Sequence, residues 1–463
     1  MLAAGALYSF DIGRSFGASE AYSAMAAAQP TFAAAVHNAL RFDQCKPPLY
    51  QVLLHGWALV FGGGDIALRA LSLIFSMANV GLMMALGAAM FAPPVGVAGA
   101  VLWALSPLAI VYGAWARMYS MYIALGLAQI LLLWNLRVAP STGKMAACAA
   151  LGAAMLYTHL GGVLLLAAEA AMLAGAAWRG ERNRAAWIAI ALAAAAFVPF
   201  VPIAVSQVSR YIYGHWVDWI GPARPVSTAR KAAVFGAAAV GGLLLVFAPR
   251  LETDEHEPVR WCVALSLLPI GALAAGSAAI RPMFDIRYVA PSAAMLVLVV
   301  AHLLSRLPGR WFSLSAFGIA SFLFFLLPYY PRYEPWRDAA GMVAGGSPTE
   351  PVFFESGYVG STAAESDPDL GFPQGFFRVP FERYFTGPNP RRVIDPSAPQ
   401  AARKLIAAAA LANHGAWLVS GLSEAKARAE MPTQCFTIDK KASSNYANLY
   451  HVVPVASCSK GAG

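Results

Sequence analysis

Nine charged side chains stand where predicted apolar helices end, and their types suit the binding of an anion. Guanidinium and ammonium groups form charge-assisted hydrogen bonds with phosphate oxygens, and a carboxylate among them could take a proton from a hydroxyl group. For any single arginine or lysine the alternative is a structural role, because such side chains commonly anchor helix ends at a membrane interface. The nine are Glu20, Asp43, Lys46, Arg69, Arg117, Arg210, Asp218, Asp285 and Arg287.

Histidines and an isolated glutamate are further candidates for chemistry. His159 follows a predicted helix end and could ligate a metal together with a carboxylate, as could His55. A lone histidine without a spaced partner is more often a hydrogen-bonding structural residue, so we expect no required cofactor and keep a divalent metal as the alternative. Glu169 falls in the middle of a predicted span, where an ionisable residue suggests function. It could instead pair with a polar group such as Gln129 between helices.

The elements that position these residues are predominantly membrane helices. The chain of 463 residues is 59% hydrophobic and 12% charged, above the roughly 45–50% apolar content of soluble domains. Its apolar runs predict about ten spans of roughly 20 residues each, and only helices satisfy their backbone groups in lipid at such lengths. We therefore expect an all-α polytopic membrane bundle. The predicted spans are 66–90, 95–112, 118–136, 145–157, 161–178, 185–205, 232–248, 261–280, 288–304 and 311–329.

The net charge of +9 is distributed in a way that argues against nucleic acid as a partner. Basic residues gather in alternate short loops, which the positive-inside rule places in the cytoplasm. The remaining loops, and the chain after residue 330, should then face outward. The cytoplasmic set is Arg137, Lys144, Arg179, Arg182, Arg184, Arg250, Arg260, Arg306 and Arg310.

Residues 1–330 form the predicted membrane domain, with a first outward loop at 11–64. No cleavable signal peptide is visible, and the orientation predicts that a first transmembrane helix ending near 7–10 has been lost from the start. Within the loop, two short helices should be separated at Pro30 and end at Pro47 and Pro48. A helix over 52–61 should lie along the membrane surface and turn at the glycines 62–64.

After residue 330 the composition shifts toward Pro, Ser, Asp and Arg, which predicts a small α/β domain over 331–463 outside the membrane. Strands are expected at "PVFFES", "GAWLVSG", "QCFTID" and "LYHVVPV", and helices at "WRDAAGMVAG", "AARKLIAAAALAN" and "SEAKARAEM". Cys435 and Cys458 both fall in this exported part, where a disulfide between them could form.

Six landmarks occur in an order that resembles GT-C glycosyltransferases, most closely the protein mannosyltransferase and aminoarabinose transferase branch. They extend from about Phe16 to Val343. All six are predicted to mark the same side of the membrane domain. They are "SFGASEAYSAM", "KPPLYQVLLHGWALVFG" with "DIALRALS", "YGAWARMYSMYIAL", "LYTHLGGVLLL", "IRYVAPS" and "EPWRDAAGMV".

This resemblance implies a transferase on the periplasmic face of a bacterial inner membrane. It would move a sugar, with inversion, from a polyprenyl-phosphate carrier to a hydroxyl group of a glycolipid, glycan or protein acceptor. Lys46 and Arg287 match the positions that bind the donor phosphate in the family, and Arg117 is a weaker third candidate. The catalytic carboxylate would be Glu20, with Asp43 in reserve. The substrate pocket is expected to include His55, Tyr119, His159, Arg210 and Tyr288.

The chain departs from the family at two positions, which leaves the chemistry open. Ser19 precedes Glu20 where the family usually has an aspartate, and Trp115 with Ala116 stands where an acidic residue is often found. Either Glu20 acts as the base, with Asp43 and then Asp11 behind it, or the chain is an altered relative that binds lipid-linked sugars. A transporter or flippase is a further alternative, although transporters more often place several polar groups at mid-membrane depth on broken helices.

Overall fold

The computed structural model describes residues 2–9, 12–43, 45–181, 183–213, 256–280, 284–307, 334–355, 375–394, 399–431, 435–443 and 447–456. The chain divides into two compact units, a helical one built mainly from residues 1–12, 45–212 and 220–330, and a second one built mainly from 13–44 and 331–463. The segment 13–44, which the sequence analysis places in the membrane domain, is grouped with the C-terminal part.

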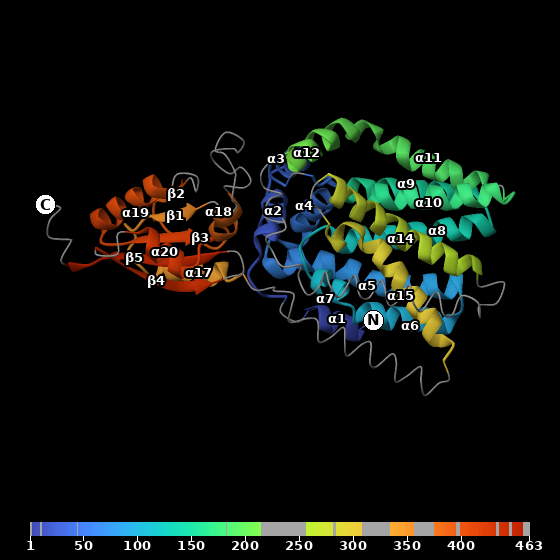
Figure 1. Cartoon of the computed structure of the whole chain (residues 1–463), viewed down its shortest axis with the longest axis horizontal. Coiled ribbons are helices and arrows are strands. Elements are labelled where there is room, and N and C mark those ends of the chain that lie inside the picture. The colour runs from blue at the N-terminus through green and yellow to red at the C-terminus, as the bar shows by residue number, and fades with distance from the viewer. Residues whose placement is uncertain are drawn as a thin grey trace. The chain divides into compact units, whose positions relative to one another are not determined.

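The helical unit contains long apolar helices joined by short turns (Figure 1). Its helices are α1 (Leu2–Ser9), α4 (Leu49–Phe61), α5 (Asp65–Met90), α6 (Pro93–Ala104), α7 (Pro107–Gly113), α8 (Tyr119–Val138), α9 (Thr142–Thr158), α10 (Gly162–Trp178), α11 (Arg184–Phe197), η1 (Val198–Phe200), α12 (Val201–Tyr213), α14 (His256–Ala279), η5 (Ile286–Val289) and α15 (Ala290–Ser305). Two of the predicted spans, 232–248 and 311–329, lie outside the described residues.

One predicted span, 95–112, is broken into α6 and α7, whose axes meet at 59°. Ser106 caps α7 by accepting a hydrogen bond from the backbone N–H of Ala109, and Pro107 occupies the first helical position. A proline there lacks only an N–H that would have no helical partner, so it favours a new helix start over continuation of α6. The sequence analysis missed this break because the residues of 95–112 are mostly apolar.

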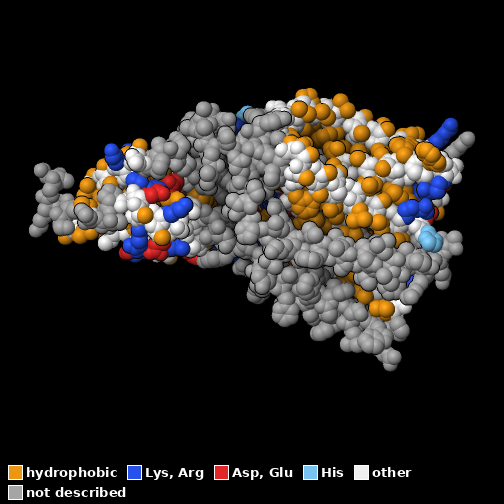
Figure 2. Space-filling model, viewed as in Figure 1, with side chains coloured by type: hydrophobic (Ala, Val, Ile, Leu, Met, Phe, Trp, Pro, Cys, Tyr) orange, Lys and Arg blue, Asp and Glu red, His pale blue; other side chains and the backbone are white. Residues whose placement is uncertain are grey.

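Several of the described helices have the length and surface of membrane-spanning segments. Five of them are long and apolar enough to cross a bilayer, and the bent pair α6 and α7 would make a sixth. Large apolar side chains on α10, α11 and α14 are exposed, among them Val163, Ile188, Leu192, Leu267 and Leu268, and Figure 2 shows hydrophobic side chains over much of the helical unit. Such a surface suits contact with lipid tails, and the chain is an integral membrane protein.

One end of the helical unit is held by ion pairs between helix termini. Arg137, in the last turn of α8, pairs with Glu257 at the start of α14 and with Glu181 after α10, 3.1 Å away. The same guanidinium group lies 4.5 Å from the ring centroid of Trp261. The predicted cytoplasmic loops are therefore joined at a shared end by charge and cation–π contacts.

The second unit contains a five-stranded mixed sheet in the order β2-β1-β3-β5-β4. Strand β1 is parallel to β2 and β3, whereas β5 is antiparallel to β3 and β4. The strands are β1 (Val352–Glu355), β2 (Arg391–Ile394), β3 (Ala416–Ser420), β4 (Phe436–Ser443) and β5 (Asn448–Pro454). The helices are α2 (Ala18–Ala27), α3 (Phe32–Phe42), α17 (Trp336–Ala344), α18 (Gly375–Glu382), α19 (Pro399–Asn413) and α20 (Glu424–Glu430).

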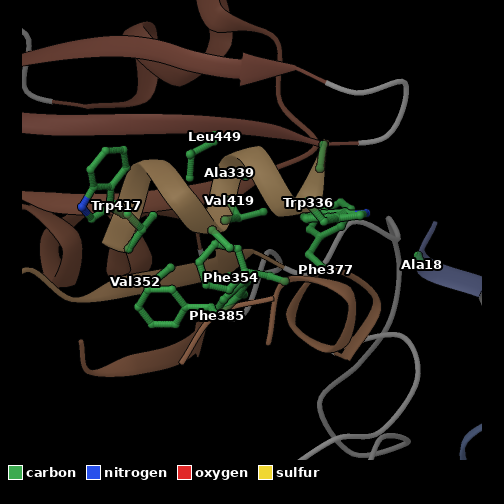
Figure 3. Packing of buried hydrophobic residues seen from close by; sticks show 14 residues of the cluster. Ala18, Trp336, Ala339, Val352, Phe354, Phe377, Phe385, Trp417, Val419 and Leu449 are labelled. Atoms are coloured by element: carbon green, nitrogen blue, oxygen red, sulfur yellow. The ribbon is translucent and has the colours of Figure 1, made fainter. Parts of the chain in front are cut away.

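Both faces of this sheet are covered, which explains why β1 and β3 are buried at every position and mostly apolar. Phe353 packs toward α19 and α20, whereas Val352 and Phe354, its neighbours in β1, pack toward α17 and α18. Figure 3 shows the second of these clusters, to which Ala18 of α2 also belongs. Alternate side chains of a strand point to opposite faces, so a sheet buried on both faces needs continuous apolar runs.

All four strands and all three helices predicted for 331–463 are present, and the two short helices predicted on either side of Pro30 are α2 and α3. Strand β2 and helix α18 were missed. Strand β2 begins with two exposed arginines at the edge of the sheet, so it lacks the apolar pattern of a buried strand. Cys435 is disulfide-bonded; its expected partner, Cys458, lies outside the described residues.

Candidate functional site

The candidate donor site in the helical unit is centred on His159, at the turn between α9 and α10. Its ring stacks on Tyr122, with centroids 4.7 Å apart, and lies near Tyr119 and Tyr288 at 5.9 and 5.6 Å. The Nδ1 atom accepts a hydrogen bond of 3.0 Å from the backbone N–H of Gly161. With Nδ1 as an acceptor, the proton of the neutral ring is on Nε2.

Three cationic side chains surround this histidine closely enough to act on its charge. Burial, followed by the charges of Lys46, Arg287 and Arg117, lowers the pKa of His159 to about 3. These cations come from segments that are far apart in the sequence, before α4, before α8 and in η5. The structure therefore brings all three predicted phosphate-binding residues to one place, beside a histidine that stays neutral at physiological pH.

Arg287 is held in position by an acidic and an aromatic neighbour. Its Nε lies 2.9 Å from Oδ2 of Asp285, whose Oδ1 also accepts the backbone N–H of Arg287 at 3.1 Å. The guanidinium carbon lies 5.8 Å and 5.4 Å from the ring centroids of Tyr119 and Tyr288. A guanidinium group oriented in this way can still offer other N–H groups to a phosphate.

Lys46 follows a backbone position that is fixed by contacts with α12. Cys45 has a left-handed φ of 63°, an uncommon conformation for a residue other than glycine. Its N–H donates to Oε1 of Gln207 at 3.0 Å, and its Sγ contacts the backbone oxygen of the same residue at 3.2 Å. Pro47 and Pro48 then restrict the backbone between Lys46 and α4.

Gly161 allows η5 to approach the turn that carries His159. A Cβ atom at residue 161 would lie 1.9 Å from the backbone oxygen of Tyr288, and 2.9 Å from both Nδ1 of His159 and the hydroxyl of Tyr122. That hydroxyl donates to the same backbone oxygen of Tyr288 at 3.1 Å. The glycine therefore allows a close contact between the histidine turn and the segment that carries Arg287.

The candidate base Glu20 lies in the second unit, in the first turn of α2. Its side chain is only 3% exposed and lies 3.9 Å from the guanidinium group of Arg14. One carboxylate oxygen accepts the backbone N–H of Gly17 at 3.0 Å, so Glu20 also caps the helix. The carboxylate is thus fixed by local bonds at the start of α2.

Asp43, the second candidate carboxylate, ends α3 in the same unit and is buried. Burial and then the charge of Asp43 raise the pKa of Tyr22, a residue of α2. The carboxylate thus faces a tyrosine of the neighbouring helix.

The other predicted residues are placed individually. His55 is buried on α4, and the side chains of Arg210 and Asp218, like Asp11, are outside the described residues. Arg69 is fully buried, and its Nη1 donates to the backbone oxygen of Ile12 at 2.8 Å, which indicates a structural role. Among the described residues, no three His, Cys, Asp or Glu side chains are grouped as a metal site would require.

Comparison with known proteins supports the fold at low sequence identity. A family model described as dolichyl-phosphate-mannose-protein mannosyltransferase matches residues 45–203. The structure of ArnT from Cupriavidus metallidurans in the apo state has a TM-score of 0.58 and 13% identity, over 97% of this chain and 96% of that one. ArnT bound to undecaprenyl phosphate gives 0.59 and 12%, with the same coverage. No curated protein matches the chain.

A third solved structure shows that the likeness in fold extends beyond ArnT. The Archaeoglobus fulgidus oligosaccharyltransferase in complex with Zn and sulfate matches with a TM-score of 0.54 and 12% identity, over 96% of this chain and 72% of that one. The chain has the GT-C fold. This confirms the resemblance inferred from the six sequence landmarks.

Within this GT-C fold, four of the six sequence landmarks contain residues of the candidate donor site around His159. "ARMY" and "YTH" supply the Tyr119 and His159 rings, "IRY" supplies Arg287, and "KPPL" supplies Lys46. Sequence reasoning missed Tyr122 and Gly161, which are both in contact with the His159 ring. Tyr122 lies three residues after Tyr119, on one helix face, and this spacing was the available signal.

Proposed function

We propose that this chain is a membrane glycosyltransferase that takes a sugar from a polyprenyl-phosphate carrier and transfers it to an acceptor hydroxyl group. The observation that carries the proposal is the group of three cations, Lys46, Arg117 and Arg287, around the neutral ring of His159. The fold likeness to ArnT, which has been solved with undecaprenyl phosphate bound, supports a lipid phosphate as the ligand of this group.

The donor phosphate would be held as it becomes the leaving group. Breaking the bond between sugar C1 and the phosphate oxygen leaves the electron pair on polyprenyl phosphate, and fixed cations stabilise that developing charge. A neutral His159 adds no further positive charge, and its Nε2–H can donate a hydrogen bond. The tyrosine rings around it suit contacts with the sugar or with the first apolar part of the lipid.

Glu20 is the proposed general base. The acceptor oxygen would attack C1 from the face opposite the phosphate, so that one displacement inverts the anomeric centre. The acceptor proton passes to the Glu20 carboxylate as the new C–O bond forms. Asp43 is the reserve candidate, and the proposal includes no cofactor or metal.

The proposed orientation follows the distribution of charge. The basic helix ends around Arg137 would face the cytoplasm by the positive-inside rule. The helix ends near Lys46, Arg117 and Arg287 would then face the periplasm of a bacterial inner membrane. The unit that contains the sheet would lie on the same side. The acceptor would be a glycolipid, glycan or protein on that side.

Release of polyprenyl phosphate from a polyprenyl-phosphate sugar tests the reaction directly. Purified wild type should release it in the presence of acceptor, whereas Glu20→Gln should bind the donor without turnover, since glutamine cannot take the proton. Lys46→Ala should weaken donor binding. Lys144→Ala is the matched control, because Lys144 lies near the start of α9, where its ammonium group donates to the backbone oxygen of Ala139. Turnover by Glu20→Gln at the wild-type rate would move the base to another residue.

A relative that binds lipid-linked sugars without transferring them is the second candidate. One observation that favours it is that the Glu20 carboxylate already caps α2 and lies beside Arg14. The other is that Ser19 stands where the family usually has an aspartate. Donor binding that requires Lys46 and Arg287, with no prenyl phosphate released from any donor, would support this candidate. Movement of intact donor across a vesicle membrane would instead support a flippase.

A further inference from the structure

Glu334 is a partly buried carboxylate that the proposed reaction does not use. It precedes α17 in the sequence, yet it binds the first residue of α2, more than 300 residues away. One carboxylate oxygen, Oε2, accepts the backbone N–H of Ala18 at 2.9 Å and the indole N–H of Trp336 at 2.8 Å. The backbone oxygen of Glu334 accepts the hydroxyl of Ser15.

These contacts surround the first turn of the helix that carries Glu20. The N–H of Gly17 is bound by Glu20 and the next N–H along the chain, that of Ala18, by Glu334. Space is tight on the other side of the carboxylate as well, because a Cβ on Gly17 would lie 2.8 Å from Oε1 of Glu334. Two acidic side chains thus share the free N–H groups of one helix start, which are favourable partners for negative charge.

We propose that Glu334 is a positioning residue for Glu20, holding the first turn of α2 so that the Glu20 carboxylate keeps one orientation. This inference rests on the proposed function, in which Glu20 is the base. Glu334 would act through α2 and would not touch the substrate. Its anchor is rigid, because Trp336 is buried in the cluster that packs α17 and α18 against the sheet (Figure 3).

Charge as well as geometry connects the two carboxylates. Burial raises the pKa of Glu334, the Trp336 and Ala18 hydrogen bonds lower it, the nearby Glu20 charge raises it, and Arg14 lowers it. Such coupling is mutual, so the charge of Glu334 should likewise favour the protonated form of Glu20. The other titratable and charged side chains on the elements packed here belong to α17, α18 and α3. They are Arg337, Asp338, Arg378, Glu382, Arg383, His37, Arg41 and Asp43.

Two substitutions in the full-length protein separate geometry from charge. Glu334→Ala removes the acceptor of both N–H groups, whereas Glu334→Gln keeps an amide oxygen that can accept them and removes only the charge. Glu424→Gln is the control, because that carboxylate is exposed and pairs only locally with Arg428 in the described structure. The readouts are hydrogen exchange at the amides of residues 15–20 and the kcat, KM and pH profile of polyprenyl phosphate release.

In Glu334→Ala we expect the Ala18 amide to lose protection and kcat to fall on the order of 10- to 100-fold, as for a misplaced catalytic group. The KM for the donor should stay unchanged. Glu334→Gln should retain protection and most of kcat, while the acidic limb of its pH profile moves to lower pH because a like charge has been removed. A role in folding alone would not move that limb.

The proposal is overturned if Glu334→Ala keeps the wild-type kcat, or if exchange at Ala18 is the same in all variants. These results differ from a failure of the proposed function. In that case wild type itself would release no prenyl phosphate from any donor, while the exchange experiment would still report the contact between Glu334 and α2. The dependence of Glu20 on that contact would then be refuted together with its role as base.

Discussion

Gly161→Ala is the substitution for which the structure gives the clearest magnitude. The new Cβ would lie 1.9 Å from the backbone oxygen of Tyr288, whereas real Cβ atoms essentially never come within 3.0 Å of another heavy atom. The difference, 3.0 minus 1.9, requires a separation of about 1 Å between the histidine turn and η5. Because the obstacle is backbone, no side-chain rotation can relieve the contact.

That displacement should affect function more than stability. Overpacking of this kind costs about 1–3 kcal/mol of folding free energy, which a membrane bundle of this size should survive. A shift of about 1 Å between catalytic groups can reduce the rate about 100-fold, and here it would separate Arg287 and Tyr288 from His159. We therefore expect a large loss of donor binding or turnover with only a modest fall in the unfolding temperature.

The assay is donor binding and prenyl phosphate release by purified Gly161→Ala, with its thermal unfolding measured in the same detergent. Gly175→Ala is the matched control, because Gly175 lies on α10, the helix that Gly161 precedes, and its Cβ would meet nothing closer than 3.7 Å. Normal donor affinity and turnover in Gly161→Ala would refute the account of this site. Equal losses in both variants would attribute the effect to α10 in general.

Three further predictions concern charge and metal. Arg403→Ala should destabilise the second unit by about 3–5 kcal/mol, since it leaves Glu355 buried without the guanidinium group 2.6 Å away; the exposed Arg428→Ala is the control in thermal unfolding, and equal effects would contradict the prediction. Because the pKa of His159 is lowered to about 3, the unfolded chain binds the extra proton first, so stability should fall as pH decreases from about 6.5 toward 3. His159→Asn should reduce that dependence in denaturation measured across this pH range, and an unchanged dependence would argue against the lowered pKa. Treatment with EDTA should leave prenyl phosphate release unchanged, and recovery of a lost rate by a divalent cation would make metal part of the mechanism.

Much of the fold could be predicted from the sequence because membrane helices and buried strands impose strong patterns. The long apolar run of 66–90 became α5, Asp65–Met90, since it contains no proline and its few polar residues are isolated from one another. The break between α6 and α7 was missed because Leu105 continues the apolar run, and only the Ser106 and Pro107 pair marks a new helix start. Strand β2 was missed because its two arginines are stabilised at a sheet edge, which local sequence does not reveal.

The cations of the candidate site could be expected from the sequence more readily than the contacts that hold the site together. Lys46, Arg117 and Arg287 belong to the nine charges at apolar helix ends, and the resemblance to GT-C glycosyltransferases singled them out. The contacts of Gly161 with Tyr288, and of Glu334 with Ala18, join segments 127 and 316 residues apart. Nothing in the local sequence indicates such pairings, because they depend on how the whole chain packs.

The affinity for polyprenyl phosphate tests the central claim most directly. The dissociation constant should be measured for wild type, Lys46→Gln, Arg287→Gln, the double variant and the control Lys144→Gln. Hydrogen bonds to charged groups contribute about 1.5–3 kcal/mol each, so each single variant at the site should bind at least about tenfold more weakly and the double variant more weakly still. Affinities equal to wild type in all variants would contradict the claim that these cations hold the lipid phosphate.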